Sequence, residues 1–286
     1  MSDGTSSDPL APFERDTLSG DYKIYFTTKR ENFRASVYNL PLLWQSFQHL
    51  DEIWIRELVD TQQIKDPNVA LPAALFRDAH ARFRIAMELA FSCCMHEAFN
   101  SLRLGIEGVY HACKILSDPK QTEQRARVWI ATAERTPEAK KAFAAAFEHN
   151  KMRSFAECGL SVLHRYWQDF SRYSHSSMDS FSIRLESVKT ATGITWNVHY
   201  FEGRPPNIAG TLFWLLLASA EMEKAFFDRF RARLDLDPSL ADLRRCFEAT
   251  KEAARQDIIR RFNWKPPNSV PTPEFSVIAK ECAKDH

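Results

Sequence analysis

Residues 100–114, NSLRLGIEGVYHACK, carry the helical pattern from which the fold class follows. Arg103, Glu107 and His111 recur every four residues and therefore share one face of a helix. The apolar residues between them lie mostly on other faces and are expected to pack: Leu102, Ile106, Val109 and Cys113. A row of Arg, Glu and His on such a helix predicts either a polar network between helices or part of a site.

The same apolar periodicity extends over residues 72–116. Because some 45 residues exceed the usual length of one globular helix, we expect a break near residues 92–96. Gly105 and Gly108 each cost ~1 kcal/mol relative to alanine inside a helix. Close approach of another helix to this turn would compensate for that cost.

Helical periodicity also predicts helices over residues 42–61, 118–134, 138–150, 154–173, 208–234 and 238–262. Asp118-Pro119 and Thr136-Pro137 are typical helix starts, with a capping side chain followed by proline. The apolar pattern of residues 21–32 is ambiguous and resembles a short strand. Alternation on both sides of a glycine-containing turn predicts a β-hairpin at about residues 181–201.

The sequence therefore predicts a mainly α fold, a multi-helix bundle with one small late β-hairpin. We expect a disordered segment at residues 1–20, a single helical domain over residues 21–264 and a proline-rich tail at residues 265–286.

Composition excludes some functions. A net charge of +1 over 286 residues argues against nucleic-acid binding by bulk electrostatics, although it permits a local basic patch. Only 8 glycines disfavour phosphate-binding loops. The longest hydrophobic run, residues 208–220, is shorter than the ~20 residues that span a bilayer. The amino-terminal residues lack a secretory signal pattern, and the six cysteines show no disulfide spacing, so we expect reduced, buried thiols in a cytoplasmic protein.

A second candidate site is SRYSHSS, residues 171–177, where a predicted helix ends. His175 could act as a general acid–base catalyst while Arg172 steadies a phosphate. Alternatively, the serines cap backbone groups and His175 packs or caps the helix end. Both interpretations remain open.

Metal and cofactor motifs are absent from the sequence. There is no HExxH, no Cys/His cluster with zinc spacing and no glycine-rich nucleotide loop. We therefore expect no cofactor. Glu107 and His111 are one turn apart and could contribute to a metal-dependent helical-bundle enzyme only with carboxylates from other helices.

The Arg103-x-x-x-Glu107 helix followed by SRYSHSS resembles a group of bacterial all-helical proteins related to HEPN-like domains of abortive-infection and toxin systems. The resemblance covers about residues 77–177 and implies a helical fold and a dimer built on helix faces. HEPN ribonucleases carry an Arg followed by a His after four to six intervening residues. Here Arg172 precedes His175 with only two residues between them, so the chain departs from that motif.

Three functions follow as hypotheses. The first is a binding or interaction module, defence-associated as the resemblance implies, with a protein or RNA partner. The second is a metal-independent ribonuclease that uses His175 with Arg172 or Arg103. The third is a metal-dependent enzyme around Glu107 and His111. The sequence leaves open whether the chain is an enzyme.

Overall fold

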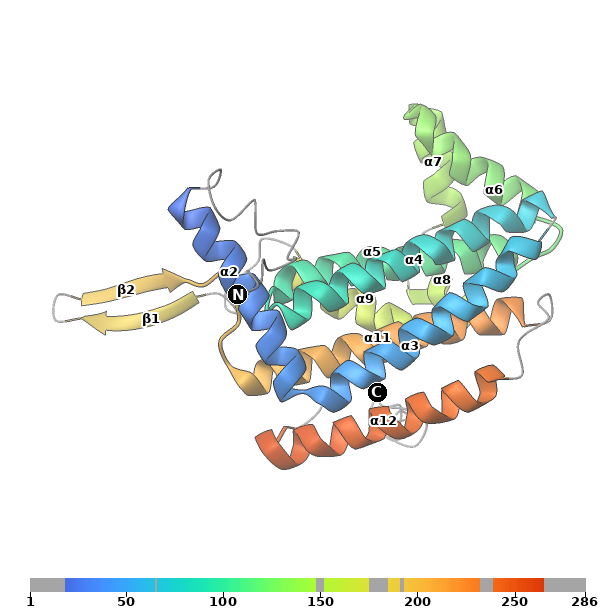
Figure 1. Ribbon diagram of the computed structural model, residues 1–286. Helices are drawn as coiled ribbons and strands as arrows, with labels where there is room; N and C mark the ends of the chain where they lie inside the picture. The colour runs from blue at the N-terminus through green and yellow to red at the C-terminus, as the bar shows by residue number, and fades with distance from the viewer. Residues whose placement is uncertain are drawn as a thin grey trace, which may run out of the picture.

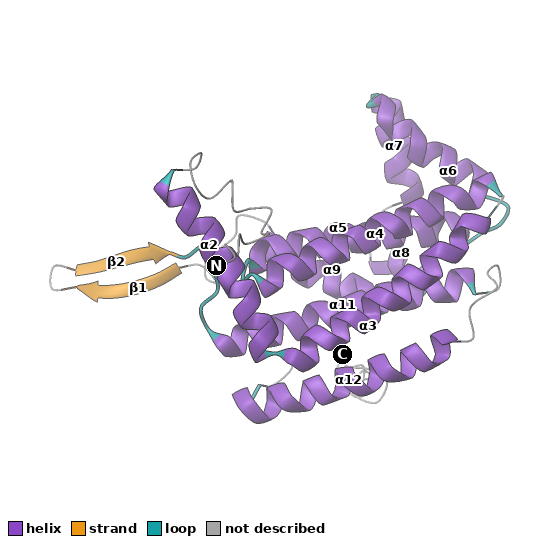
Figure 2. Ribbon diagram, viewed as in Figure 1, coloured by secondary structure: helices purple, strands orange, loops and turns teal. Residues whose placement is uncertain are grey.

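The computed structural model describes residues 19–64, 66–147, 152–174, 185–190, 193–231 and 239–264. Within these residues the chain is mainly helical, as the periodicity predicts (Figures 1 and 2). The helices are α2 (Gly20–Asn39), α3 (Pro41–Asp60), η1 (Thr61–Gln63), α4 (Pro67–Phe91), α5 (Met95–Leu116), α6 (Thr122–Ala131), η2 (Thr132–Glu134), α7 (Pro137–Phe147), α8 (Met152–Glu157), α9 (Ser161–Ser174), α11 (Pro205–Phe230) and α12 (Ser239–Phe262).

Two strands lie in the segment where alternation predicts a hairpin. β1 (Leu185–Thr190) and β2 (Gly193–Val198) pair antiparallel. In their register Leu185 is opposite Val198, and Thr190 is opposite Gly193. The two residues between the strands, and residues 181–184 before them, lie outside the described residues, as do residues 1–18 and 265–286, where the disordered segment and the tail are expected.

Helix α5 lies at the centre of the bundle. It packs antiparallel against α4 and also contacts α9 and α11, while α12 lies along α3 and α11 (Figure 1). The buried apolar residues form one cluster across these helices. Its largest fully buried side chains are Trp54, Tyr110, Tyr166, Phe47, Phe76, Phe83, Phe91, Phe147, Phe155, Phe170, Phe213 and Phe226.

The long helical pattern is broken where expected, because α4 ends at Phe91 and α5 begins at Met95. The glycines of α5 meet α4 closely. A Cβ added at Gly105 would lie 3.5 Å from the carbonyl oxygen of Ala79, and one at Gly108 would lie 3.5 Å from that of Leu75. The predicted close approach of a second helix is therefore confirmed.

The strand-like interpretation of residues 21–32 is wrong, since α2 is helical through Asn39. Alternation is misleading there because Tyr22, Ile24 and Phe26 are exposed and do not define a buried face. The later half of the helix holds it to the bundle, where Phe33 packs edge-on against Trp44 at 5.6 Å between ring centroids.

Helix starts differ from the predictions at two places. α4 begins at Pro67, five residues before the predicted start, because Asp66 caps it by accepting a hydrogen bond from the Asn68 amide at 2.9 Å. α6 begins only at Thr122, because residues 118–121 form a turn that the Gln121 amide closes by donating to the Asp118 carbonyl at 3.0 Å. The Thr136 cap is confirmed: its hydroxyl accepts from the Ala139 amide at 3.1 Å.

The single helix predicted over residues 154–173 is two helices, α8 and α9. Gly159 has a φ of +72° and ends α8 in the left-handed conformation that glycine favours. The Leu160 amide donates to the Phe155 carbonyl and closes this cap. The chain can therefore turn and start α9 at Ser161.

Most of the cysteines are buried thiols, as predicted. Cys93, Cys94, Cys113 and Cys158 are free and buried, whereas Cys246 is exposed and corrects the prediction at that position. In the described part of the chain, every helix is too short or too polar to cross a bilayer.

Candidate functional site

The Arg103–Glu107 face forms a polar contact between α5 and α9. Arg103 Nε lies 3.2 Å from Glu107 Oε1, and both side chains are 19% exposed. The indole N–H of Trp167, on α9, donates to the same carboxylate oxygen at 2.8 Å. Glu107 is thus engaged from two sides, as expected of a network that joins two helices.

His111 belongs to a different environment. Its Nδ1 accepts a hydrogen bond from the Trp129 indole at 3.4 Å. The rings of Phe143 and Phe147 meet the imidazole edge-on, with centroids 5.3 Å and 5.2 Å away. His111 therefore packs among α6 and α7, one turn beyond the Arg103–Glu107 pair.

The SRYSHSS segment is described only in part. Arg172 lies near the end of α9 with its side chain 69% exposed, 3.9 Å from Asp169. His175 lies outside the described residues. The predicted catalytic pairing of His175 with Arg172 or Arg103 therefore stays a prediction. Within the described ranges, no three His, Cys, Asp or Glu side chains are grouped closely enough to hold a metal ion.

A polar cluster of His80, Asp51 and Arg84 lies between α3 and α4 and was not predicted from the sequence. His80 Nε2 lies 2.7 Å from Asp51 Oδ1, and Arg84 donates to both oxygens of the same carboxylate. Burial alone would raise the pKa of Asp51, but the hydrogen bonds from His80 and Arg84 outweigh it and lower that pKa to about 2. The His80 ring stacks on Trp54 at 5.5 Å, so the cluster joins two helices.

The turn between α4 and α5 shapes one end of the bundle. The Cys94 amide donates to the Leu89 carbonyl and the Cys93 amide to the Ala90 carbonyl, which is the hydrogen-bond pattern of a Schellman cap. Cys93 occupies the left-handed position of this cap, with a φ of 63°, where glycine is usual. Its carbonyl accepts from the Glu202 amide at 3.0 Å, which ties the turn to the segment before α11.

Glu202 is a buried carboxylate at the same end. Its side chain is 4% exposed and is paired with the guanidinium of Arg204, which donates to both oxygens at 2.7 Å. The Arg204 amide and the Asn207 side chain also donate to it. Burial would raise the pKa of Glu202, but these hydrogen bonds outweigh burial and lower the pKa. The carboxylate therefore stays ionised, and the positive charge of Arg204 balances it.

Two cavities meet at Glu202. We call the first the aromatic cavity; its volume is about 250 Å³, and its walls include Phe99 from α5, Tyr173 from α9, Trp214 from α11 and Trp264 beyond α12. The second, the Cys93 cavity, has a volume of about 440 Å³ and is lined by residues of α2, the α4–α5 turn and the ends of α11 and α12.

Trp264 lies directly on α11. A Cβ built on Gly210 would overlap Trp264 Nε1, so the indole occupies space that only a glycine leaves free. The ring also meets Phe213 edge-on at 5.7 Å. Gly210 thus determines the position of the Trp264 indole in the wall of the aromatic cavity.

Trp214 contributes an unsatisfied donor. The residue is 8% exposed, and its indole Nε1 is buried without a hydrogen-bond partner among the described residues. Leaving such a donor unpaired costs about 1–3 kcal/mol. This cost arises at a residue that lines the aromatic cavity.

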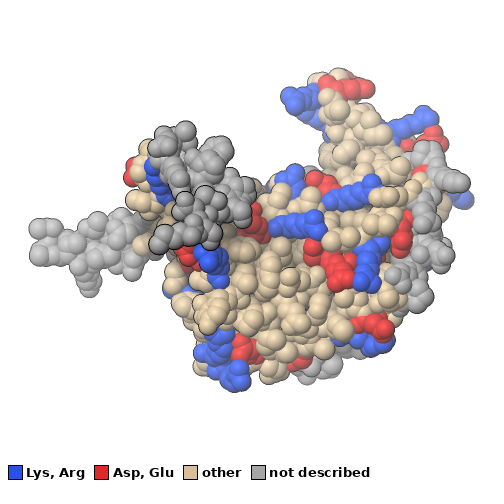
Figure 3. Space-filling model, viewed as in Figure 1, with Lys and Arg blue, Asp and Glu red and all other residues tan. Residues whose placement is uncertain are grey.

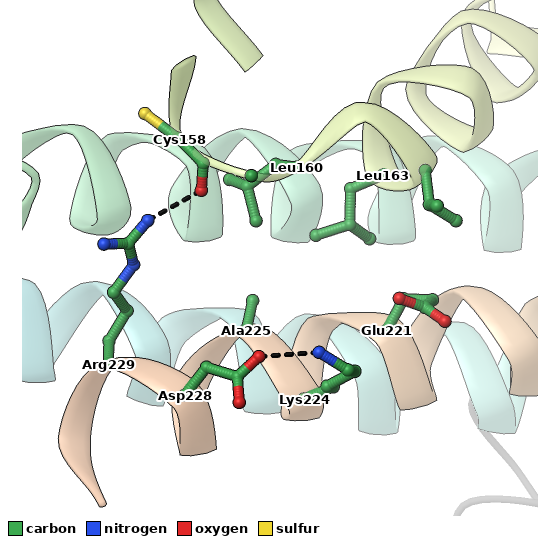
Figure 4. Close-up of a pocket in the computed structure, with 10 residues that line it drawn as sticks. Cys158, Leu160, Leu163, Glu221, Lys224, Ala225, Asp228 and Arg229 are labelled. Atoms are coloured by element: carbon green, nitrogen blue, oxygen red, sulfur yellow. Dashed lines mark hydrogen bonds and ion pairs between the residues drawn. The ribbon is translucent and has the colours of Figure 1, made fainter. Parts of the chain in front are cut away.

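A further groove of about 250 Å³ lies between α11 and the start of α9 (Figure 4). Its charged groups are already engaged, since Lys224 pairs with Asp228 at 2.6 Å and Arg229 donates to the Cys158 carbonyl at 2.6 Å. Burial raises the pKa of the Glu221 carboxyl beside them. The groove is more polar than the aromatic cavity.

The aromatic cavity was not predicted from the sequence. Of its four aromatic walls, only Tyr173 belongs to a segment that the sequence predicts as a candidate site. Comparison with protein-family models, curated proteins and solved structures finds no match to this chain.

Proposed function

We propose that this chain is a binding module whose ligand occupies the aromatic cavity. The observation that carries the proposal is a cavity of about 250 Å³ walled by four aromatic side chains from four separate segments. Aromatic walls with a few polar groups are typical of small-molecule sites. The polar groups here are the amide of Asn207, the hydroxyl of Thr211 and the neutralised carboxylate of Glu202.

The polar face of α5 supports this choice over chemistry at Arg103, Glu107 and His111. Glu107 is held by Arg103 and Trp167, and His111 packs among aromatic rings. These contacts suit a structural role. On the face that Figure 3 shows, basic and acidic side chains are interspersed, whereas nucleic-acid binders usually gather basic residues on one face.

The other expectations from the sequence stay predictions. A homodimer, an RNA or protein partner and a link to defence systems rest on the resemblance alone. Ribonuclease activity depends on His175, so RNA cleavage by the wild-type protein and its loss in His175→Ala would establish it. The four buried, free thiols favour a reducing, cytoplasmic location.

The proposal is tested with a library of small aromatic fragments, screened by ligand-observed NMR against the wild-type protein and two glycine variants. In Gly210→Ala the new methyl group displaces Trp264, so fragments should bind at least about tenfold more weakly. Gly20→Ala is the control, because a Cβ there meets no atom within 4 Å. Equal binding to all three proteins would contradict the proposal, as would no binding at all.

A further inference from the structure

We infer that the groove between α11 and the start of α9 binds a small aliphatic ammonium ion through the carboxylate of Glu221 (Figure 4). Among the described residues, none lines both this groove and the aromatic cavity, so the groove is a second site and the inference is independent of the proposed function. Three features of the groove support it: an unpaired carboxylate, the placement of the charges around that carboxylate and an apolar wall.

The Glu221 carboxylate is partly buried and lacks a donor. It lines the groove, and no described residue forms a hydrogen bond or an ion pair with it. Its oxygens are not among the sealed, unpaired polar atoms of the described chain, so both oxygens reach solvent. A partly buried carboxylate without a donor costs free energy, which a ligand that donates a hydrogen bond recovers.

The lysines near Glu221 are engaged elsewhere. Lys224 pairs with Asp228 at 2.6 Å, and Lys251 pairs with Glu248 at 2.6 Å. Burial raises the pKa of Glu221 in spite of the charges of these two lysines, which lower it. A ligand cation in contact with the carboxylate would oppose the effect of burial and stabilise the ionised form.

The two ends of the groove differ in charge. Arg229 follows Glu221 by eight residues on α11, which is roughly 12 Å along the helix axis. Arg229 donates to the Cys158 carbonyl, close to the amino terminus of α9 and its positive partial charge. Glu221 lies toward the other end, on the side of Leu163 (Figure 4). Arg229 and the helix terminus are therefore remote from a cation bound at Glu221.

Apolar side chains and a small volume determine what such a cation carries. Leu160, Val162 and Leu163 line the groove around the start of α9, and Ala225 lines it from α11. The volume of about 250 Å³ equals the space of roughly eight waters at ~30 Å³ each. This holds an ammonium group with a chain of about five carbons, so the groove encloses a whole free amine of that size.

The test is an NMR titration of the ¹⁵N-labelled full chain with pentylamine, a cation at neutral pH, and with pentan-1-ol, which has the same length and no charge. Glu221→Gln removes the charge and keeps the shape of the side chain. Glu31→Gln is the matched control, because the Glu31 side chain is 54% exposed on α2 and does not line the groove. We expect Glu221→Gln to weaken pentylamine binding at least about tenfold and to leave pentan-1-ol binding unchanged.

Any of three results would overturn the inference: no binding of pentylamine to the wild-type protein, equal affinities of that protein for pentylamine and pentan-1-ol, or equal affinities of Glu221→Gln and Glu31→Gln for pentylamine. Each of them leaves the proposed function standing, because Gly210→Ala tests the aromatic cavity separately.

A second measurement needs no variant. In the wild-type protein, pentylamine should shift the amide signals of Leu163 and Ala225 and leave those of Phe99 and Thr211, which line the aromatic cavity, in place. Shifts confined to residues outside the groove would contradict the site.

The same ammonium group also occurs in the lysine side chain of a peptide. Nα-acetyl-lysine methylamide presents that side chain between two amide groups, and we expect it to bind more weakly than pentylamine. Tighter binding of the lysine derivative would overturn the assignment of a free amine as the ligand.

Discussion

Cys93 occupies a backbone position that disfavours every side chain. Its φ of 63° lies in the left-handed region, where a residue with a Cβ is strained and glycine is not. We therefore expect Cys93→Gly to be more stable than Cys93→Ala by about 1 kcal/mol, the reverse of the usual order in regular structure. Urea unfolding of both variants measures this difference. An alanine variant as stable as the glycine variant would show that the turn is not strained.

We expect Glu107 to stabilise the fold more as a hydrogen-bond acceptor than through its charge. Glu107→Ala removes the carboxylate that accepts from the partly buried Trp167 N–H and should cost about 1–3 kcal/mol of unfolding free energy. Glu107→Gln keeps an oxygen for Trp167 and loses only a half-buried ion pair with Arg103, so it should cost less than about 1 kcal/mol. Chemical denaturation compares the two. Equal losses of unfolding free energy in the two variants would instead show that the charge of Glu107 provides the stabilisation.

At the scale of elements, we expect alanine substitutions at the two glycines of α5 to change stability in opposite directions. A Cβ at Gly105 would lie 3.0 Å from Met222 Cε and 3.2 Å from Arg82 Cβ, so in Gly105→Ala the Met222 side chain and the α4 backbone at Arg82 must each give way by a few tenths of an ångström. A Cβ at Gly108 meets only the Leu75 carbonyl at 3.5 Å, an ordinary contact. Gly108→Ala should therefore stabilise the protein by up to ~1 kcal/mol through helix propensity, whereas Gly105→Ala should destabilise it. Thermal unfolding decides the order, and equal Tm values would contradict it.

Helix α12 is anchored by a buried pair of carboxylates. Arg244 donates to Glu57 on α3 and to Glu223 on α11, and both carboxylates are buried. Burial raises the pKa of Glu57 and of Glu223, and their mutual repulsion adds to the shift at Glu57. The pair therefore retains a proton at neutral pH, which the unfolded chain has lost.

A retained proton makes stability depend on pH with a definite sign. Because the folded-state pKa is raised, the stabilisation is complete below the unfolded pKa of a glutamate and is lost as pH rises. Between pH ~7 and ~8.5 the free energy of unfolding should fall by up to about 1.4 kcal/mol per unit. Glu57→Gln mimics the protonated form and should flatten this dependence. An unchanged slope in urea titrations of the variant would refute a shared proton.

For the whole molecule, the sequence predicts the central helices because each presents a continuous apolar stripe to the core. It fails for α2, where much of the apolar surface is exposed and only contacts such as that of Phe33 with Trp44 hold the helix. The sequence also predicts one helix where the structure has α8 and α9, because a single residue, Gly159, ends a helix without interrupting the apolar pattern.

The candidate site was less predictable than the fold. Arg103 and Glu107 do form the expected pair, but periodicity cannot reveal that Trp167 completes it from another helix. The aromatic cavity joins segments as distant as Phe99 and Trp264, and such convergence depends on tertiary packing. Its sequence signal is weak, because buried aromatic residues occur throughout the core.

The most direct test of the central claim is where an aromatic probe binds. The indole N–H signals of the ¹⁵N-labelled protein report this, once assigned by single Trp→Phe variants. During a titration with quinoline, we predict that the signals of Trp214 and Trp264 shift together while that of Trp54, fully buried against His80, stays in place. Binding without a shift of either signal would contradict the assignment of the aromatic cavity as the binding site.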